Sequence, residues 1–367
     1  MCKSIGLYVH IPFCMSKCNY CDFFSVKSTF DNMDKYVDHM CRLLKTYGSR
    51  LHTGVDTIYF GGGTPSVMGT DRLLRIINTI YSSFEVENNC EITIEVNPKS
   101  GKVLDFKALS SSGVNRVSLG VQSVNKNELK ILGRLHCNDD VDNTVQQIRN
   151  AGIDNVSLDL MIGIPEQTVD SLEKSIVFCD TLNPRHISAY ILKVEENTPF
   201  YKNKEKLNLP NEDRQIEFYE YMCKRLDSLG YAQYEISNFA KADWKSKHNL
   251  KYWNAEEYLG LGPGAHSFIK GKRFYFNRCF SDFFNNITVD DGGGGDEEEY
   301  AMMRLRLSVG LREDEYKKRF GHSIPPVYYN RCFKFKNAGL LDYNNKGIWF
   351  TSKGFLVSNT LIADIIY

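Results

Sequence analysis

The chain carries no excess of charge of either sign. Among its 367 residues, Lys and Arg together number 45 and Asp and Glu together number 45, so the formal net charge is zero. A protein whose main partner is RNA or DNA normally shows a basic excess or a basic stripe. The composition therefore argues against a nucleic-acid substrate or partner.

Long hydrophobic runs are also missing. No run approaches the roughly 18 apolar residues that a membrane-spanning helix needs, although hydrophobic residues make up 42% of the chain and suffice for a large core. The apolar stretch from Ile5 to Phe13 is short and is interrupted by His10 and Pro12, which argues against a secretory signal peptide. With scattered cysteines in a chain of this size, these absences predict a cytoplasmic protein in a reducing compartment.

A fourth clustered cysteine is absent near the start of the chain. Cys14, Cys18 and Cys21 follow the spacing C-x3-C-x2-C, and no further Cys or His follows at a similar spacing, as a zinc site would require. An iron–sulfur cube is usually held by four thiolates, so three ligands would leave one iron open to a small molecule. The spacing favours a reactive 4Fe-4S cluster, with three buried cysteines or half of a zinc site as alternatives.

Short β-rich runs alternate with segments of helical periodicity in the first half of the chain. This alternation indicates βαβ units and a parallel sheet. We predict an α/β fold, a partial (β/α)6 barrel over residues 1–200, with a doubly wound open sheet as the alternative. The predicted strands are Leu7–Ile11, Thr57–Phe60, Glu91–Val96, Arg116–Val121, Asn155–Leu160 and His186–Leu192.

The alternation fades after about residue 200. Residues 201–290, which include a helix over Glu212–Leu229, are expected to complete the barrel. The run at residues 291–296 contains four consecutive glycines, which predicts a flexible linker. Residues 297–367 read as helices around a hairpin and predict a small winged-helix-like α+β domain.

Polar residues and glycines follow the ends of the predicted strands. Because the carboxyl ends of parallel strands meet at one edge, these groups should converge there. Glycines let the backbone approach a ligand, and the carboxylates could hold an ammonium group or ribose hydroxyls. A tight turn, helix caps and solvated surface charges are the alternatives. The groups are Gly61–Pro65, Glu95, Asn97, Gln122, Asp159 and Tyr190, with Arg134 nearby as a partner for a carboxylate.

These motifs together resemble the radical S-adenosylmethionine (SAM) superfamily. In that superfamily SAM chelates the open iron of the cluster, and an electron from the cluster cleaves SAM to a 5′-deoxyadenosyl radical. The resemblance implies that Cys14, Cys18 and Cys21 hold the cluster and that Tyr20 packs beside it. It assigns SAM contacts to Tyr8, Gly62, Gly63, Thr64, Glu95, Gln122, Arg134 and Asp159.

Further motifs resemble the oxygen-independent coproporphyrinogen III oxidase family, which has two branches; these motifs are the runs Tyr8–Cys14, Ile94–Pro98, Gly120–Gln122 and Asp159–Pro165. The decarboxylating oxidases carry an additional cysteine two residues after the third ligand, where this chain has Phe23. The run from His248 to Trp253 reads His-Asn-x-x-Tyr-Trp and resembles the signature of the HemW-type haem chaperones. The resemblance implies haem as a third cofactor, with His248 as the candidate iron ligand and His266 as a weaker candidate.

The expected function is that of a haem chaperone. Such a protein would bind a 4Fe-4S cluster, SAM and haem and deliver haem to acceptor proteins, and the resemblance also allows a peripheral membrane contact during delivery and a dimer. The alternative is an oxygen-independent coproporphyrinogen III oxidase, because every residue needed to cleave SAM is present. Whether the chain is catalytic is left open by the sequence.

Overall fold

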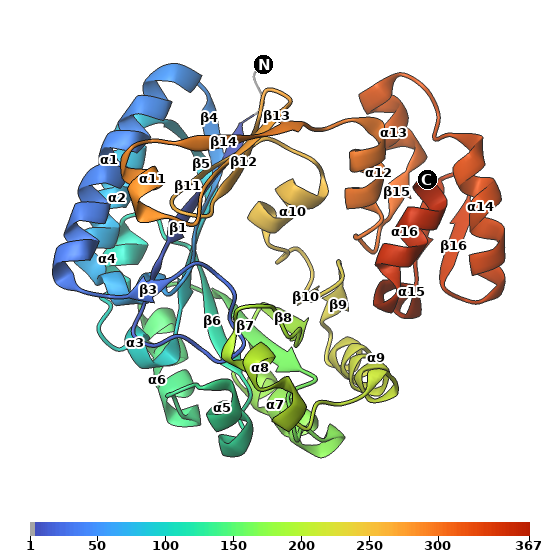
Figure 1. Cartoon of the computed structure of the whole chain (residues 1–367), viewed down its shortest axis with the longest axis horizontal. Helices are drawn as coiled ribbons and strands as arrows, with labels where there is room; N and C mark the ends of the chain where they lie inside the picture. Colours follow the sequence, from blue (N-terminus) through green and yellow to red (C-terminus); the bar gives the residue numbers. More distant parts are fainter. Residues whose placement is uncertain (1–3) are drawn as a thin grey trace.

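The computed structural model describes residues 4–367 and contains one twelve-stranded mixed sheet (Figure 1). The seven central strands, from β11 to β8, run parallel, and the strands at both edges are antiparallel. In spatial order the strands are β14 (Thr288–Gly293), β13 (Lys272–Phe276), β12 (His266–Ile269), β11 (Tyr258–Leu261), β1 (Ile5–Ile11), β4 (Gly54–Gly62), β5 (Glu85–Val96), β6 (Arg116–Gln122), β7 (Asn155–Ile162), β8 (His186–Ile191), β10 (Asn238–Ala240) and β9 (Ala232–Gln233).

The order of the strands identifies the sheet as a partial barrel. Strands β1, β4, β5, β6, β7 and β8 are neighbours in chain order, without the reversal that defines a doubly wound sheet. The helices that follow these strands lie along the outer face of the sheet (Figure 1). They are α1 (Phe30–Leu51), α2 (Thr70–Ser83), α3 (Pro98–Gly101), α4 (Phe106–Ser111), α5 (Lys126–Leu132), α6 (Asn138–Asn150) and α7 (Val169–Thr181). The helices that come after β8 in the chain and before residue 297 are α8 (Pro199–Lys202), α9 (Glu212–Ser228), α10 (Lys247–Trp253) and α11 (Phe280–Phe284).

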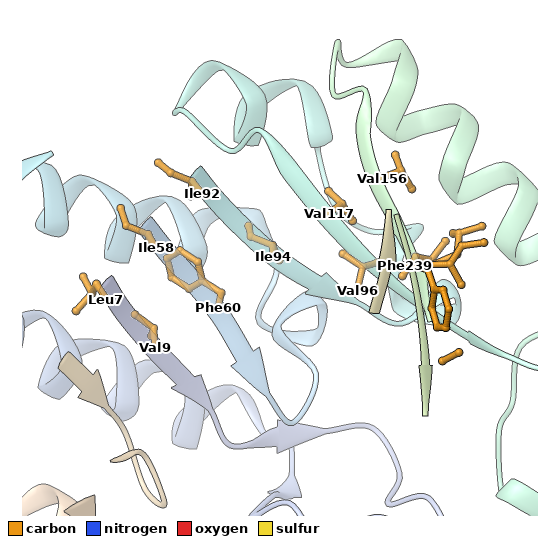
Figure 2. Close-up of a cluster of buried hydrophobic side chains, with 14 of the residues drawn as sticks. Leu7, Val9, Ile58, Phe60, Ile92, Ile94, Val96, Val117, Val156 and Phe239 are labelled. Carbon is orange, nitrogen blue, oxygen red and sulfur yellow. The ribbon is translucent and has the colours of Figure 1, made fainter. Parts of the chain in front are cut away.

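Strand alternation separates an apolar outer face from a polar inner face. Figure 2 shows Leu7, Ile58, Phe60 and Ile94 on three neighbouring strands, and these side chains are buried against the outer helices. Because successive side chains on a strand point to opposite faces, the residues between them face the inside of the barrel. The inward positions include Tyr8 on β1, Thr57 and Tyr59 on β4, Glu91 and Glu95 on β5, and Ser157 and Asp159 on β7.

Residues 297–367 form a small α+β unit, as the sequence predicts, shown in orange and red in Figure 1. Its three-stranded sheet has the order β15-β17-β16. On the barrel side, the Arg319 guanidinium donates hydrogen bonds to the carbonyls of Asn254 (3.3 Å) and Ala255 (3.1 Å). Its elements are α12 (Glu297–Arg304), β15 (Leu311–Arg312), α13 (Glu313–Phe320), α14 (Pro326–Asn337), β16 (Leu341–Asn344), β17 (Gly347–Phe350), α15 (Ser352–Leu356) and α16 (Ser358–Ile366).

The glycine run differs from its prediction. Residues 291–293, predicted as part of a flexible linker, are the end of edge strand β14, which pairs with β13. The next residue, Gly294, still donates its N–H to the Gly271 carbonyl at 3.0 Å. A Cβ atom at Gly294 would lie 2.7 Å from the Arg273 side chain, and one at Gly295 would lie 2.8 Å from the Phe268 ring. The glycines therefore permit close packing, which composition alone does not reveal.

Among the described residues, no helix combines the length and the apolar character that crossing a bilayer requires.

Candidate functional site

A cavity of about 690 Å³ opens at the carboxyl ends of the parallel strands. The three clustered cysteines line it, together with most of the residues predicted to contact SAM. The predicted convergence of polar groups at one edge of the sheet is therefore present. The predicted residues that line the cavity are Cys14, Cys18, Tyr20, Cys21, Gly62, Gly63, Thr64, Glu95, Gln122, Arg134 and Asp159.

The cysteine-bearing loop is held by backbone pairing at its base and by one side chain within it. Strands β2 (Phe13–Cys14) and β3 (Val26–Lys27) pair in parallel on either side of the loop. Between the cysteines, Asn19 donates its backbone N–H to the Leu132 carbonyl (3.1 Å) and its side-chain amide to the Ile131 carbonyl (2.8 Å). Sequence reasoning missed Asn19, because no local pattern indicates its contact with a helix end more than 110 residues away.

The glycine turn after β4 is explained by packing against the cysteine loop. Gly62 has φ +106°, and a Cβ atom there would lie 2.4 Å from the His10 ring. Gly63 donates its N–H to the Ile11 carbonyl at 2.8 Å, and Thr64 donates to the Phe13 carbonyl at 2.7 Å. The tight turn thus brings the Thr64 hydroxyl within 3.4 Å of the Cys14 sulfur.

Two inward-facing carboxyl groups lie deep in the cavity. Glu95 accepts hydrogen bonds from the Tyr59 hydroxyl (2.9 Å) and the Gly62 N–H (3.2 Å). Burial raises the pKa of Glu95 to about 7 and that of Asp159 to about 6. Asp159 accepts a hydrogen bond from the Ser118 hydroxyl at 3.0 Å. A bound ligand with N–H or O–H donors would favour the ionised forms of both carboxyl groups.

Arg134 supplies a buried positive charge beside the cysteines. Its guanidinium donates to the Tyr20 hydroxyl at 2.7 Å and lies 5.9 Å from the centre of that ring. Burial opposes the charge, but the neighbouring Tyr20, Cys18 and Cys21 together hold the pKa of Arg134 above its ordinary value. Arg134 Nε and Gln122 Oε1 are buried without a hydrogen-bond partner. Unpaired buried polar atoms are costly, so these two fit a polar ligand in the cavity.

The three cysteines lie where a cluster held by three thiolates would be expected. Among residues 4–367, no three His, Cys, Asp or Glu side chains converge closely enough to hold one metal ion. In a cube each thiolate binds its own iron corner, so the three sulfurs surround the cluster and do not meet at one atom. The three cysteine residues are partly exposed, free, and carried on one loop that faces the cavity.

Two predicted cofactor-binding residues, Tyr8 and His248, do not line the cavity. Tyr8 makes a 3.1 Å hydrogen bond with His10, and its ring packs against Tyr59, which does line the cavity. His248 is fully buried, with Nδ1 2.9 Å from the Thr57 hydroxyl and Nε2 2.8 Å from the Tyr252 hydroxyl. Burial lowers the pKa of His248 to about 3, so the ring is neutral. Both ring nitrogens are thus occupied, and neither is free for iron in this structure.

The run that contains His248 forms helix α10, which is anchored near the amino ends of β1, β4 and β5. Glu91 accepts the backbone N–H groups of Lys247 and His248, each at 3.1 Å. Lys251 forms a 2.8 Å ion pair with Asp56 and donates to the Ser4 carbonyl. The run therefore holds α10 against the inner face of the barrel, where the His248 ring stacks on Tyr59 (5.2 Å between ring centres), a residue that lines the cavity.

Residues 8–179 match the radical SAM superfamily, and residues 298–357 match the HemN C-terminal domain. The chain is 32% identical to the heme chaperone HemW of Bacillus subtilis, with 97% of each chain covered. It is 34% identical to the heme chaperone HemW of Lactococcus lactis, covering 99% of this chain and 98% of that protein. This chain belongs to the HemW family.

The HemW relatives extend over both parts of the chain, the barrel and the C-terminal unit. A solved structure of coproporphyrinogen III oxidase from Escherichia coli matches with a TM-score of 0.85 over 99% of this chain and 90% of that chain, at 20% identity. That likeness establishes the fold of this HemW family member: a radical SAM barrel followed by a HemN-type C-terminal domain.

Proposed function

We propose that the protein is a haem chaperone that binds a 4Fe-4S cluster, SAM and haem and passes haem to acceptor proteins. The observation that carries this proposal is the similarity to proteins named heme chaperone HemW along almost the whole length of both chains. Phe23, at the position where the oxidases carry an additional cysteine, supports the same choice.

The cavity offers separate groups for the cluster and for SAM. Cys14, Cys18 and Cys21 would hold the cluster, and Thr64 and Arg134 border it. Ionised Glu95 and Asp159 would accept hydrogen bonds from the amino group and the ribose of SAM, while the unpaired atoms of Gln122 and Arg134 would complete the polar contacts. When bound, cluster and SAM would together supply one-electron chemistry.

The second candidate is an oxygen-independent coproporphyrinogen III oxidase. The cavity favours it in one respect, since it brings together the cysteines, Glu95, Gln122, Arg134 and Asp159 that SAM cleavage would use. Turnover of coproporphyrinogen III separates the two functions, because a chaperone releases its cargo chemically unchanged.

The deciding experiment is anaerobic. The cluster is first reconstituted in the protein. SAM, a strong reductant and coproporphyrinogen III are then added, and the amounts of protoporphyrinogen and 5′-deoxyadenosine formed are measured. Haem is titrated into a parallel sample. We expect haem binding with a shifted Soret band and no protoporphyrinogen. Protoporphyrinogen formed over many turnovers would show that the protein is an oxidase, and the chaperone proposal would be wrong.

We also propose a cytoplasmic location. The ten cysteines among residues 4–367 are all free of disulfides, which suits a reducing compartment. Haem-acceptor proteins are the proposed partners. A peripheral membrane contact during delivery and dimerisation stay predictions, and both are accessible to sedimentation and vesicle-binding assays.

A further inference from the structure

Arg116 is a deeply buried cation inside the barrel. It belongs to β6 and is 2% exposed. Its neighbour Val117 pairs in register with the outward-facing Ile94, and successive side chains of a strand alternate between faces, so Arg116 points to the inner face. Its Nε atom has no hydrogen-bond partner. A buried charge with an unpaired donor is costly, so we looked for a role beyond packing.

Arg116 lies one inward layer beneath the acidic part of the cavity. On the neighbouring strand β5, Thr93 pairs with Arg116, and Glu95 pairs with Ser118, the next inward residue of β6. The Ser118 hydroxyl donates to Asp159 on β7. Glu95, Ser118 and Asp159 line the cavity, whereas Arg116 does not. Its positive charge therefore lies on the amino-end side of both carboxyl groups, where it does not meet a ligand of the cavity.

The carboxylate that attracts Arg116 most strongly is already engaged with another element. Both oxygens of Glu91 accept backbone N–H groups at the start of α10. Burial alone would lower the pKa of Arg116, but four nearby groups raise it above its ordinary value; in order of strength they are Glu91, Tyr59, Tyr234 and Asp159. Arg116 therefore stays charged at neutral pH, and part of its field reaches the cavity.

The charge of Arg116 acts on both acids of the site. Burial raises the pKa of Glu95 to about 7 and that of Asp159 to about 6, and Arg116 opposes this rise at both groups. Without the cation both groups would hold their protons more tightly. A protonated carboxyl group offers fewer acceptors to the N–H and O–H donors of a ligand than a carboxylate does.

Other titratable and charged groups surround these three residues. Burial raises the pKa of the tyrosines and of Cys179 and lowers that of the two histidines, so these groups stay neutral between pH 6 and pH 9. Burial also raises the pKa of Glu235, near Tyr190 and Tyr234, to about 7, so the signal of Glu95 has to be assigned by substitution. The surrounding groups are Tyr8 on β1, Tyr59 on β4, Glu91 on β5, Arg134 after α5, Cys179 on α7, His186 and Tyr190 on β8, Tyr234 and Glu235 after β9, and His248 and Tyr252 on α10.

We propose that Arg116 is a positioning residue for SAM that acts through Glu95 and Asp159: its charge keeps both carboxylates available to the donors of the ligand. The inference rests on the proposed function, since it takes SAM as the ligand. Direct attraction is not the mechanism. SAM carries a sulfonium and an ammonium group against one carboxylate and is a net cation, so Arg116 by itself repels it.

The test is the pH profile of SAM binding to the full-length, cluster-reconstituted protein, measured by equilibrium dialysis from pH 6 to pH 9. Arg116→Met removes the charge and keeps a long side chain. It should weaken SAM binding about three- to tenfold at pH 7 and leave it equal or tighter at pH 9, where the carboxyl groups ionise without the cation. Arg116→Lys keeps the charge and should follow the wild-type profile. Arg116→Gln is a second uncharged variant and should behave like Arg116→Met.

Arg304→Met is the matched control. Arg304 on α12 is also a buried arginine, 6% exposed, with an unpartnered Nε, and it does not line the cavity. The control should lose stability and keep the wild-type SAM profile. Two results would overturn the inference. Equal weakening of SAM binding by Arg116→Met at pH 7 and pH 9 would show a merely structural role, and unchanged binding at both would show that the charge does not affect the site.

A measurement without SAM separates the inference from the proposed function. The infrared band of the protonated Glu95 carboxyl group, assigned by its loss in Glu95→Gln, is titrated in the SAM-free protein. Its midpoint should rise by about one pH unit in Arg116→Met and stay in place in Arg116→Lys. If the wild-type protein binds no SAM, the proposed function fails, and this titration still decides the role of Arg116. Equal midpoints in the wild-type protein and in Arg116→Met would refute that role.

Discussion

Single residues in the cavity owe their positions to strand alternation. Glu95 and Asp159 face inward because Ile94 and Leu158, their neighbours in sequence, are buried outward. The residue types and strand ends that can be read from the sequence therefore place most cavity residues correctly. They do not place Tyr8 and His248, because hydrogen bonds to His10, Thr57 and Tyr252 cannot be read from local sequence.

Replacing Cys18 by Ala should abolish the cluster. Three thiolates are the fewest that hold a cube with one open iron, so two should not retain it. We expect loss of the broad absorbance near ~400 nm and of bound iron and sulfide. Cys279→Ala serves as the control, because Cys279 is partly buried and does not line the cavity. A full complement of iron and sulfide in Cys18→Ala would contradict the assignment.

The affinity for SAM should depend on pH through Glu95. Its pKa is raised by burial to about 7, and only the ionised carboxylate accepts hydrogen bonds at both oxygens. Lowering the pH from 7.5 to 6 should therefore weaken SAM binding by about three- to tenfold. In Glu95→Gln, binding should be weaker and change less with pH, and equilibrium dialysis measures both.

The raised pKa of Glu95 also determines how the stability of the SAM-free protein depends on pH. Because the folded-state pKa lies above the ordinary value of 4.5, the contribution of Glu95 to stability is complete below about pH 4.5 and is lost as the pH rises through about 7. A SAM affinity that is equal at pH 6 and pH 7.5 would show that Glu95 does not meet SAM.

Whole elements were predictable where periodicity was local. The six predicted strands coincide with β1, β4, β5, β6, β7 and β8 to within a few residues at most ends. Strand β11 could not be foreseen as their parallel neighbour, since Tyr258–Leu261 pairs with Gly6–Val9 across some 250 residues. Strand β14 was missed because its terminal glycines disfavour a strand on composition, whereas here they allow close packing.

Helix α10 should lose much of its anchoring in His248→Ala. The substitution opens a cavity and leaves the buried Thr57 and Tyr252 hydroxyls without their shared partner. We expect a loss of about 2–4 kcal/mol in the free energy of unfolding, measured in urea. Tyr252→Phe removes one of the two hydrogen bonds and should cost about 1 kcal/mol. An unchanged unfolding free energy would refute the structural role of His248.

The whole molecule depends on contacts between the barrel and the C-terminal unit. Arg304 on α12 is 6% exposed and pairs with Asn254 at the end of α10 and with Glu315 on α13. This buried cation thus joins three helices. Helices around a hairpin were predictable from periodicity in residues 297–367, although the last predicted helix is two helices, α15 and α16. The junction was not predictable, because its partners are distant in sequence.

Replacing Arg304 by Ala should loosen the junction by about 2 kcal/mol, because it leaves hydrogen-bonding groups on two helices without their partner. Faster hydrogen exchange in α10 and α12, at unchanged exchange in β4 and β5, is the expected result. Lys318→Ala is the control, since Lys318 is exposed and lies on the neighbouring helix α13. Equal protection of α10 in Arg304→Ala and in the wild-type protein would contradict this account.

The position of α10 has a consequence for access to the cavity. Helix α10 lies near the amino ends of β1, β4 and β5, while the cavity opens at the carboxyl ends. A ligand of the cavity therefore enters and leaves on the same side, next to the cysteine-bearing loop. Anything that covers this side slows both the entry and the release of a ligand bound deep in the cavity.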